Sequence, residues 1–172
     1  METSEPFPVI FLIVTRIIIN SLDIISIINI AMSFFLLLLS AMISGAEIAF
    51  FSLRADELKE IEKKQDIRSR IIIRHLHKPK KFLATLTIAN GFINISFIML
   101  MGILLNQVFN FTKNPALGFM LQIAFIGILL LLFGDLFPKF YAKNKPKKFV
   151  RLTAIPILIL DRVFHPFSIL MI

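Results

Sequence analysis

The sequence contains no cysteine among its 172 residues, which excludes disulfide bonds, zinc–thiolate sites and cysteine nucleophiles. It also lacks a Walker phosphate-binding loop, a glycine-rich nucleotide fingerprint and a serine–histidine–aspartate set. Its three histidines, His75, His77 and His165, lie in basic or proline-flanked stretches, a setting that does not favour a zinc site. These absences leave no argument for catalysis, and we expect a protein that is not an enzyme.

Acidic residues are outnumbered by basic ones, and the net charge is +8 at pH 7. Ten of the 19 Lys and Arg residues lie between Arg54 and Lys81, and six lie between Lys139 and Arg151. Aromatic residues do not interleave with them as on a nucleic-acid-binding surface, so we expect no nucleic-acid partner. Basic clusters beside apolar segments are typical of cytoplasmic loops, which predicts an extracytoplasmic N-terminus and a cytoplasmic C-terminus.

The N-terminus has no basic segment before its apolar run, and so it does not resemble a cleaved signal peptide. The apolar run Val9–Ile19 is interrupted by Arg16 and is too short to cross a bilayer. We interpret residues 1–23 as an extracytoplasmic or interfacial segment, with a re-entrant element as the alternative.

Apolar residues make up 57% of the chain, against roughly 45–50% in soluble domains. The mean hydropathy is +0.84, and the apolar residues occur in long runs. This composition predicts an integral membrane protein, and we expect an all-α protein of the inner (plasma) membrane. Runs at about 24–51, 83–111 and 116–137 are each long enough to span, since a span needs about 20 residues.

Charged segments separate and follow the predicted spans. Residues 52–82 combine ten basic and five acidic residues with apolar residues near helical spacing: Leu58, Ile61, Ile67, Ile71 and Ile72. This pattern predicts a belt of amphipathic juxtamembrane helices that contacts anionic lipid headgroups. The transmembrane domain proper is expected over residues 24–151. Residues 152–172, interrupted by Pro156 and Pro166, are interpreted as a juxtamembrane helix leading to cytoplasmic domains, with a fourth membrane-dipping segment as the alternative.

Asn90 and Asn94 lie within the second predicted span. They are four residues apart, so both amides project from one face of a helix. An amide that faces lipid is costly, so the pair should face protein, water or an ion. Two interpretations follow: hydrogen bonding across a helix interface, or hard oxygen ligands for a cation such as Mg²⁺.

Polar residues also interrupt the first span. Ala41, Gly45 and Ala49 repeat every four residues, a spacing that permits close helix packing. Ser44 and Glu47 lie on one face, and a glutamate within a span requires a partner. Glu47 therefore either contributes to an ion site or extends toward Arg54 or the lipid headgroups.

The third span ends in Gly134-Asp135-Leu136-Phe137-Pro138-Lys139. Pro138 cannot donate to the Gly134 carbonyl, so we expect the helix to be broken at Gly134–Pro138. Freed carbonyls in an unwound turn can bind cations, and Asp135 would add negative charge. The alternative is a kinked helix in which Asp135 pairs with Lys139.

Three stretches resemble the signatures of a known domain, in order and across nearly the whole chain. Residues 44–53 (SGAEIAFFSL) are similar to SGAExAxxSL, residues 83–94 (LATLTIANGFIN) to LLxTLLxGNxxxN, and residues 134–139 (GDLFPK) to GExxPK. These are the signatures of the DUF21 transmembrane domain shared by the cyclin M (CNNM) and CorC magnesium transporters. Residues 44–53 also resemble gliding-motility-associated members.

The resemblance implies a homodimer with three spans and a juxtamembrane belt in each protomer. It also implies a dehydrated, transported Mg²⁺ in contact with Ser44, Asn90, Asn94 and the Gly134 turn. Full-length members carry cytoplasmic domains that bind ATP. Asp135 stands where the family has glutamate and is one methylene shorter, so it is expected to act through water or charge. We therefore expect the membrane domain of a Mg²⁺ exporter. The alternative is a membrane scaffold of a motility or secretion machine that transports nothing.

Overall fold

The computed structural model describes residues 24–108 and 115–170, and the predicted N-terminal segment 1–23 lies outside them. The described residues form helices joined by short connections, with no strand among them. Three of these stretches are long and apolar enough to cross a membrane: Ile24–Phe51, Pro79–Gln107 and Pro115–Asn144. The predicted all-α membrane fold with three spans is confirmed.

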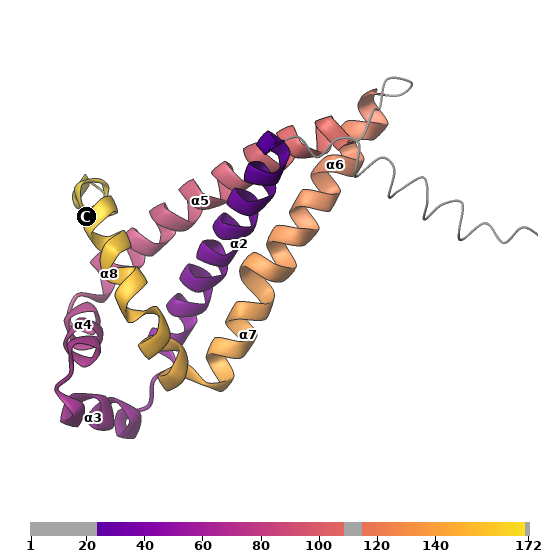
Figure 1. The fold of residues 1–172 in the computed structure, drawn as a ribbon. Coiled ribbons are helices and arrows are strands. Elements are labelled where there is room, and N and C mark those ends of the chain that lie inside the picture. The colour runs from indigo at the N-terminus through magenta and orange to yellow at the C-terminus, as the bar shows by residue number, and fades with distance from the viewer. Residues whose placement is uncertain (1–23, 109–114, 171–172) are drawn as a thin grey trace, which may run out of the picture.

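Helix α2 (Ile24–Phe51) lies between the other two spans (Figure 1). It packs on one side against α5 (Pro79–Val108). On the other side it packs against the third span, which consists of α6 (Pro115–Leu129), a π-helical segment η1 (Leu130–Leu136) and α7 (Phe137–Asn144). Most large apolar side chains on the outer faces of these spans are exposed, as expected for surfaces that contact lipid.

The third span differs from the prediction near Pro138. The expected break at Gly134–Pro138 takes the form of the π-helical segment η1, and the chain does not unwind there. The Phe137 N–H donates to the Leu132 carbonyl, five residues back. The helix thus widens by one residue per turn next to Pro138, which has no N–H to donate. The helix then continues through Asn144, beyond the predicted end at Phe137.

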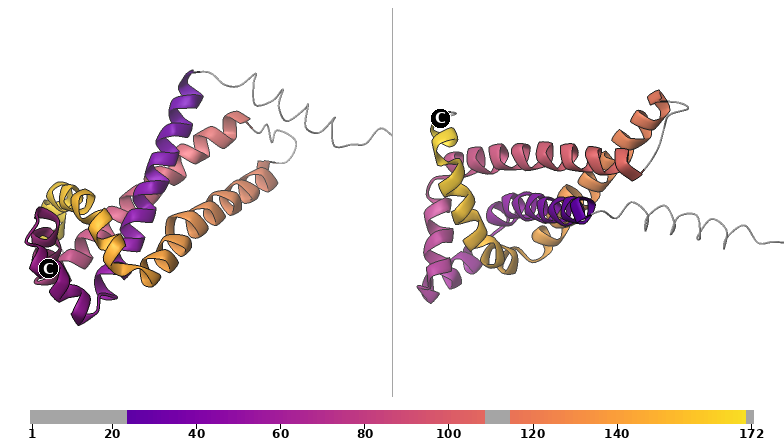
Figure 2. Two further views of the ribbon diagram at one scale, coloured as in Figure 1. Left: turned by 60° about the horizontal axis from the view of Figure 1, so that its bottom comes forward. Right: turned by 45° about the horizontal axis from the view of Figure 1, so that its top comes forward.

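The charged segment after α2 forms two short helices, α3 (Ala55–Lys64) and α4 (Ile67–Leu76), at one end of the bundle (Figure 2). The chain turns between them at Gln65, which adopts a left-handed conformation with φ 47°. Ile61, Ile71 and Ile72 are buried as amphipathic helices require, whereas Ile67 is exposed because it begins α4 away from the core.

Helix α8 (Pro146–Leu170) crosses this end of the bundle and packs against α2, α4 and α5 (Figure 2). It runs through Pro156 without a break, and a helix was expected over this part of the chain. It is not among the three helices that qualify as candidate spans in the described chain. Its apolar face, including Phe149, Val150 and Ile157, joins α2, α4 and α5 in the main buried cluster.

Two ion pairs connect α8 to the belt. Lys147 pairs with Glu60 of α3, and the Arg151 guanidinium lies 2.6 Å from Asp66, which caps α4. Hydrogen bonds from Ser69, supported by the charge of Arg151, hold the pKa of Asp66 below its ordinary value. The stabilisation that these contacts give to the folded state is therefore fully present at pH values above the unfolded-state pKa of Asp66. It is lost as the pH falls through the lower folded-state pKa.

Gly45 permits a close contact between α2 and α8. A Cβ at this position would lie 2.7 Å from Cε1 of Phe149, whose ring is itself buried in the core. Gly45→Ala is therefore expected to destabilise the fold by about 1–3 kcal/mol through overpacking. Thermal unfolding in detergent measures this. Gly91→Ala is the matched control, because nothing lies within 4 Å of a Cβ there. Equal melting temperatures for the two variants would contradict the assigned contact.

Candidate functional site

Three side-chain oxygens converge between α2 and α5. The Ser40 hydroxyl lies 2.7 Å from Oδ1 of Asn94 and 3.2 Å from Oδ1 of Asn90. Ser40 is 1% exposed, and both asparagines are half-buried. The predicted amide pair thus faces protein, and its first interpretation, hydrogen bonding across a helix interface, describes the arrangement in this structure.

The hydrogen bonding of this cluster leaves an excess of acceptors. A serine hydroxyl carries a single hydrogen, so it can satisfy only one of the two amide oxygens fully at any moment. No other donor to either oxygen occurs in the described part of the chain. The two amide oxygens therefore share a single hydroxyl hydrogen.

Gly134 brings the third span to the same cluster. A Cβ on this residue would lie 3.1 Å from the Ser40 Oγ, so the π-helical backbone approaches the hydroxyl directly. An alanine at this position would require the neighbouring atoms to shift by a few tenths of an ångström. The structure therefore gathers Asn90, Asn94 and Gly134 around Ser40, from three different spans.

Ser44 and Glu47 continue the polar face of α2 toward the belt. Ser44 lies one turn beyond Ser40, is 1% exposed, and its hydroxyl has no hydrogen-bond partner among the described residues. Glu47 is half-buried and forms no ion pair within that same part of the molecule. Arg54 pairs with Asp56 at 3.3 Å, so the alternative in which Glu47 reaches Arg54 is not what the structure has.

Asp135 is held differently from the other predicted residues. Its carboxylate forms an ion pair with Lys139 at 2.7 Å, one helical turn along, and the two side chains are 46% and 36% exposed. The Asp135–Lys139 ion pair, which belongs to the alternative drawn from the sequence, is therefore present. Among the described residues, no hydrogen bond joins Asp135 to Ser40 or to the asparagines.

Ser40 is the residue that sequence reasoning missed. A signal was present, because Ser40 and Ser44 are four residues apart, the same spacing as Asn90 and Asn94.

The hydroxyls near the belt end of α5 behave as expected, since Thr85 bonds back to the Lys81 carbonyl at 3.1 Å. Among the described residues, no group of three or more His, Asp and Glu could hold a metal ion, so a cation here would depend on neutral oxygens.

The sequence matches a known family over most of its length. A family model described as the cyclin M transmembrane N-terminal domain matches residues 31–172, which include every residue of the candidate site. No curated protein matches the chain. The family is one of divalent-cation transporters, and the match covers far more than half of the sequence. The chain therefore belongs to the CNNM family, as its cyclin M transmembrane N-terminal domain.

Proposed function

We propose that this chain is the ion-conducting membrane domain of a Mg²⁺ exporter. The supporting observation is the convergence of Ser40, Asn90 and Asn94 on the Gly134 backbone, with one hydroxyl hydrogen shared among three oxygens. Hard, neutral oxygens suit Mg²⁺, which accepts hydroxyl, amide and carbonyl ligands in a compact shell. Rotation of the Ser40 hydroxyl would offer a lone pair to the ion in place of the hydrogen.

Each predicted residue has a role in this proposal. Asn90, Asn94 and the Gly134 turn contact the ion, and Ser44, whose buried hydroxyl has no partner, completes the set from α2. Glu47 and Asp135 supply negative charge from a distance, Asp135 through water or after leaving Lys139. A mostly neutral shell holds a divalent ion less tightly than a carboxylate cage would, which favours release and therefore transport over storage.

The test is Mg²⁺ binding by the purified full chain, measured as thermal stabilisation, followed by flux from proteoliposomes. Asn94→Ala should weaken binding more than Thr87→Ala, which removes an exposed hydroxyl on the same helix. An ion at ten times its Kd stabilises the folded state by about 1.4 kcal/mol, so loss of the site is measurable. Equal stabilisation of both variants by Mg²⁺ would remove Asn94 from the site.

We further propose that the belt helices and α8 lie on the cytoplasmic side of the inner membrane, as part of a homodimer. The ten basic residues of the segment 54–81 and the six of 139–151 support this orientation, because basic residues are retained on the cytoplasmic face. There they would contact anionic lipid headgroups.

Cysteine labelling tests the orientation, since the native chain has no cysteine. In intact cells, Asn114→Cys should react with a membrane-impermeant reagent, whereas Gln65→Cys should be protected until the cells are opened. The reverse pattern would invert the proposed topology. Reaction at both positions in intact cells would show that they lie on the same side of the membrane. It would contradict the single span, α5, that separates them.

The Asp135–Lys139 pair favours a second candidate function. It satisfies the one carboxylate of the third span without an ion, as in a membrane scaffold that retains the fold but transports nothing. The flux measurement separates the two functions. A scaffold should show neither Mg²⁺-dependent stabilisation nor Mg²⁺ flux.

A further inference from the structure

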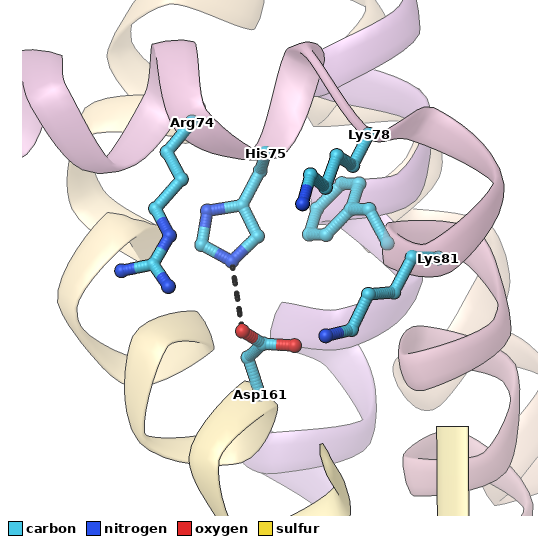
Figure 3. A pocket seen from close by; sticks show the side chains of 6 residues that line it. Arg74, His75, Lys78, Lys81 and Asp161 are labelled. Carbon is cyan, nitrogen blue, oxygen red and sulfur yellow. Dashed lines mark ion pairs between the residues drawn. The ribbon is translucent and has the colours of Figure 1, made fainter. Parts of the chain in front are cut away.

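A second polar site lies at the belt end of the bundle, away from the cation cluster. A cavity of about 80 Å³ there is lined by Arg74, His75, Lys78, Lys81, Phe82 and Asp161. These residues come from α4, from its connection to α5, from the start of α5 and from α8 (Figure 3). The cavity therefore lies where the belt, the second span and α8 meet.

His75 presents one bare ring nitrogen to this cavity. Its Nδ1 lies 2.7 Å from the Ile71 carbonyl oxygen, which can only accept, so Nδ1 carries a hydrogen. The ring is 5% exposed and packs between Phe82 and Phe50, with ring centroids 4.9 Å and 6.4 Å away. Its Nε2 is buried without a hydrogen-bond partner among the described residues and lies 3.7 Å from Oδ2 of Asp161 (Figure 3). In the neutral ring, two acceptor atoms therefore face each other.

A proton on Nε2 would remove this mismatch. The charged ring donates from both nitrogens, so Nε2 would pair with the Asp161 carboxylate, whose side chain is 18% exposed. Oδ1 of the same carboxylate accepts from the Thr85 hydroxyl of α5 at 3.4 Å. A single proton bound between His75 and Asp161 would therefore join α4 to α8 and, through Thr85, to α5.

The charged groups around the ring act in both directions. Arg74 of the same helix and Lys78 of the connection line the cavity and oppose a further positive charge, as burial does. Lys81 of α5 also lines it and has an interaction of its own. Helix α2 adds no charged side chain to the described lining. The negative charge nearest the ring in that lining is Asp161, and an opposite charge within about 4–6 Å favours the charged form of a histidine.

We propose that His75 and Asp161 form a pH-sensitive link between α4 and α8. The side chain of a histidine gains its charge as the pH falls from about 8 to about 5, so the link forms at the lower end of this range. The stability that the link gives to the fold is present at low pH and is lost as the pH rises. The link is independent of the proposed transport function, because it shares no residue with the cation cluster.

Nitrogen NMR of the full chain, labelled at histidine and held in neutral detergent, tests the proton directly. The chain has three histidines, so the spectrum is simple, and His75→Gln and His77→Gln assign the signals. At about pH 8 the His75 ring should carry a hydrogen on Nδ1 alone, and at about pH 5 on both nitrogens. A bare Nε2 at the lower pH, as when a water molecule bridges the two acceptors, would overturn the proposal. So would a hydrogen on Nε2 at the higher pH.

A double-mutant cycle tests the link itself. Thermal unfolding of His75→Gln, Asp161→Asn and the double variant should show a coupling of about 2–4 °C in melting temperature at low pH. At high pH the coupling should fall to near zero. His77→Gln is the matched control, because His77 is exposed two residues away and lies outside the cavity lining, so its effect should add to that of Asp161→Asn at both pH values. No coupling at low pH, or equal coupling at both, would contradict a pH-sensitive link.

Discussion

Ser40→Ala is expected to weaken Mg²⁺ binding by about tenfold or more while the protein still folds. The substitution removes the oxygen that lies closest to both amide oxygens and to the Gly134 backbone. A factor of ten corresponds to about 1.4 kcal/mol, well within the contribution of one hard ligand to a dehydrated cation. Folding should lose about 1–3 kcal/mol, because the half-buried amide oxygens are left without a donor among the described residues.

Ser33→Ala is the matched control for this experiment. Ser33 is also a buried serine of α2, seven residues earlier, and its hydroxyl has no partner among the described residues. Its removal should therefore leave Mg²⁺ affinity unchanged and should not destabilise the fold, because an unsatisfied buried hydroxyl is itself unfavourable. Mg²⁺ titration monitored by thermal unfolding compares the two variants. If Ser40→Ala binds as tightly as Ser33→Ala, Ser40 only connects helices and does not contact the ion.

Gly134→Ala is expected to impair both stability and Mg²⁺ binding. The new Cβ would lie 3.1 Å from Ser40 Oγ and 3.3 Å from Cδ1 of Leu130, so η1 must move away from α2 or the Ser40 side chain must rotate. Overpacking of this kind costs about 1–3 kcal/mol, and either movement disperses the converging oxygens. Gly134→Val should have a larger effect in the same direction. Thermal unfolding with and without Mg²⁺ measures both consequences.

Gly127→Ala separates this contact from the general effect of a glycine in a helix. Gly127 lies in α6, two turns before Gly134, and nothing is within 4 Å of a Cβ there. Alanine at that position should stabilise the helix by about 0.5–1 kcal/mol, because glycine loses more backbone entropy on folding. Wild-type Mg²⁺ affinity in Gly134→Ala would show that the approach of η1 to Ser40 is not part of the ion site.

The predicted ion-site residues of the second span show how much of the site local sequence patterns can predict. Asn90 and Asn94 were identified from their spacing alone, because a helix places residues four apart on one face whatever surrounds it. The pairing of Asp135 with Lys139 was likewise a local alternative, set by one helical turn. Ser40 was not identified, because α2 buries four serines and only the rotation of α2 against α5 decides which of them meets the amides.

The three spans, their charged belt and the family could be predicted from the sequence, because the bilayer sets the length of an apolar span and motifs are read along the chain. Other features depend on how the helices pack. Tertiary packing replaced the expected unwound turn at Pro138 with the π-helical segment η1, and it placed the apolar face of α8 against the core. It also places His75 within 3.7 Å of Asp161, although the two residues are 86 positions apart in the sequence. Contacts between distant segments depend on how helices rotate and pack, which no local spacing encodes.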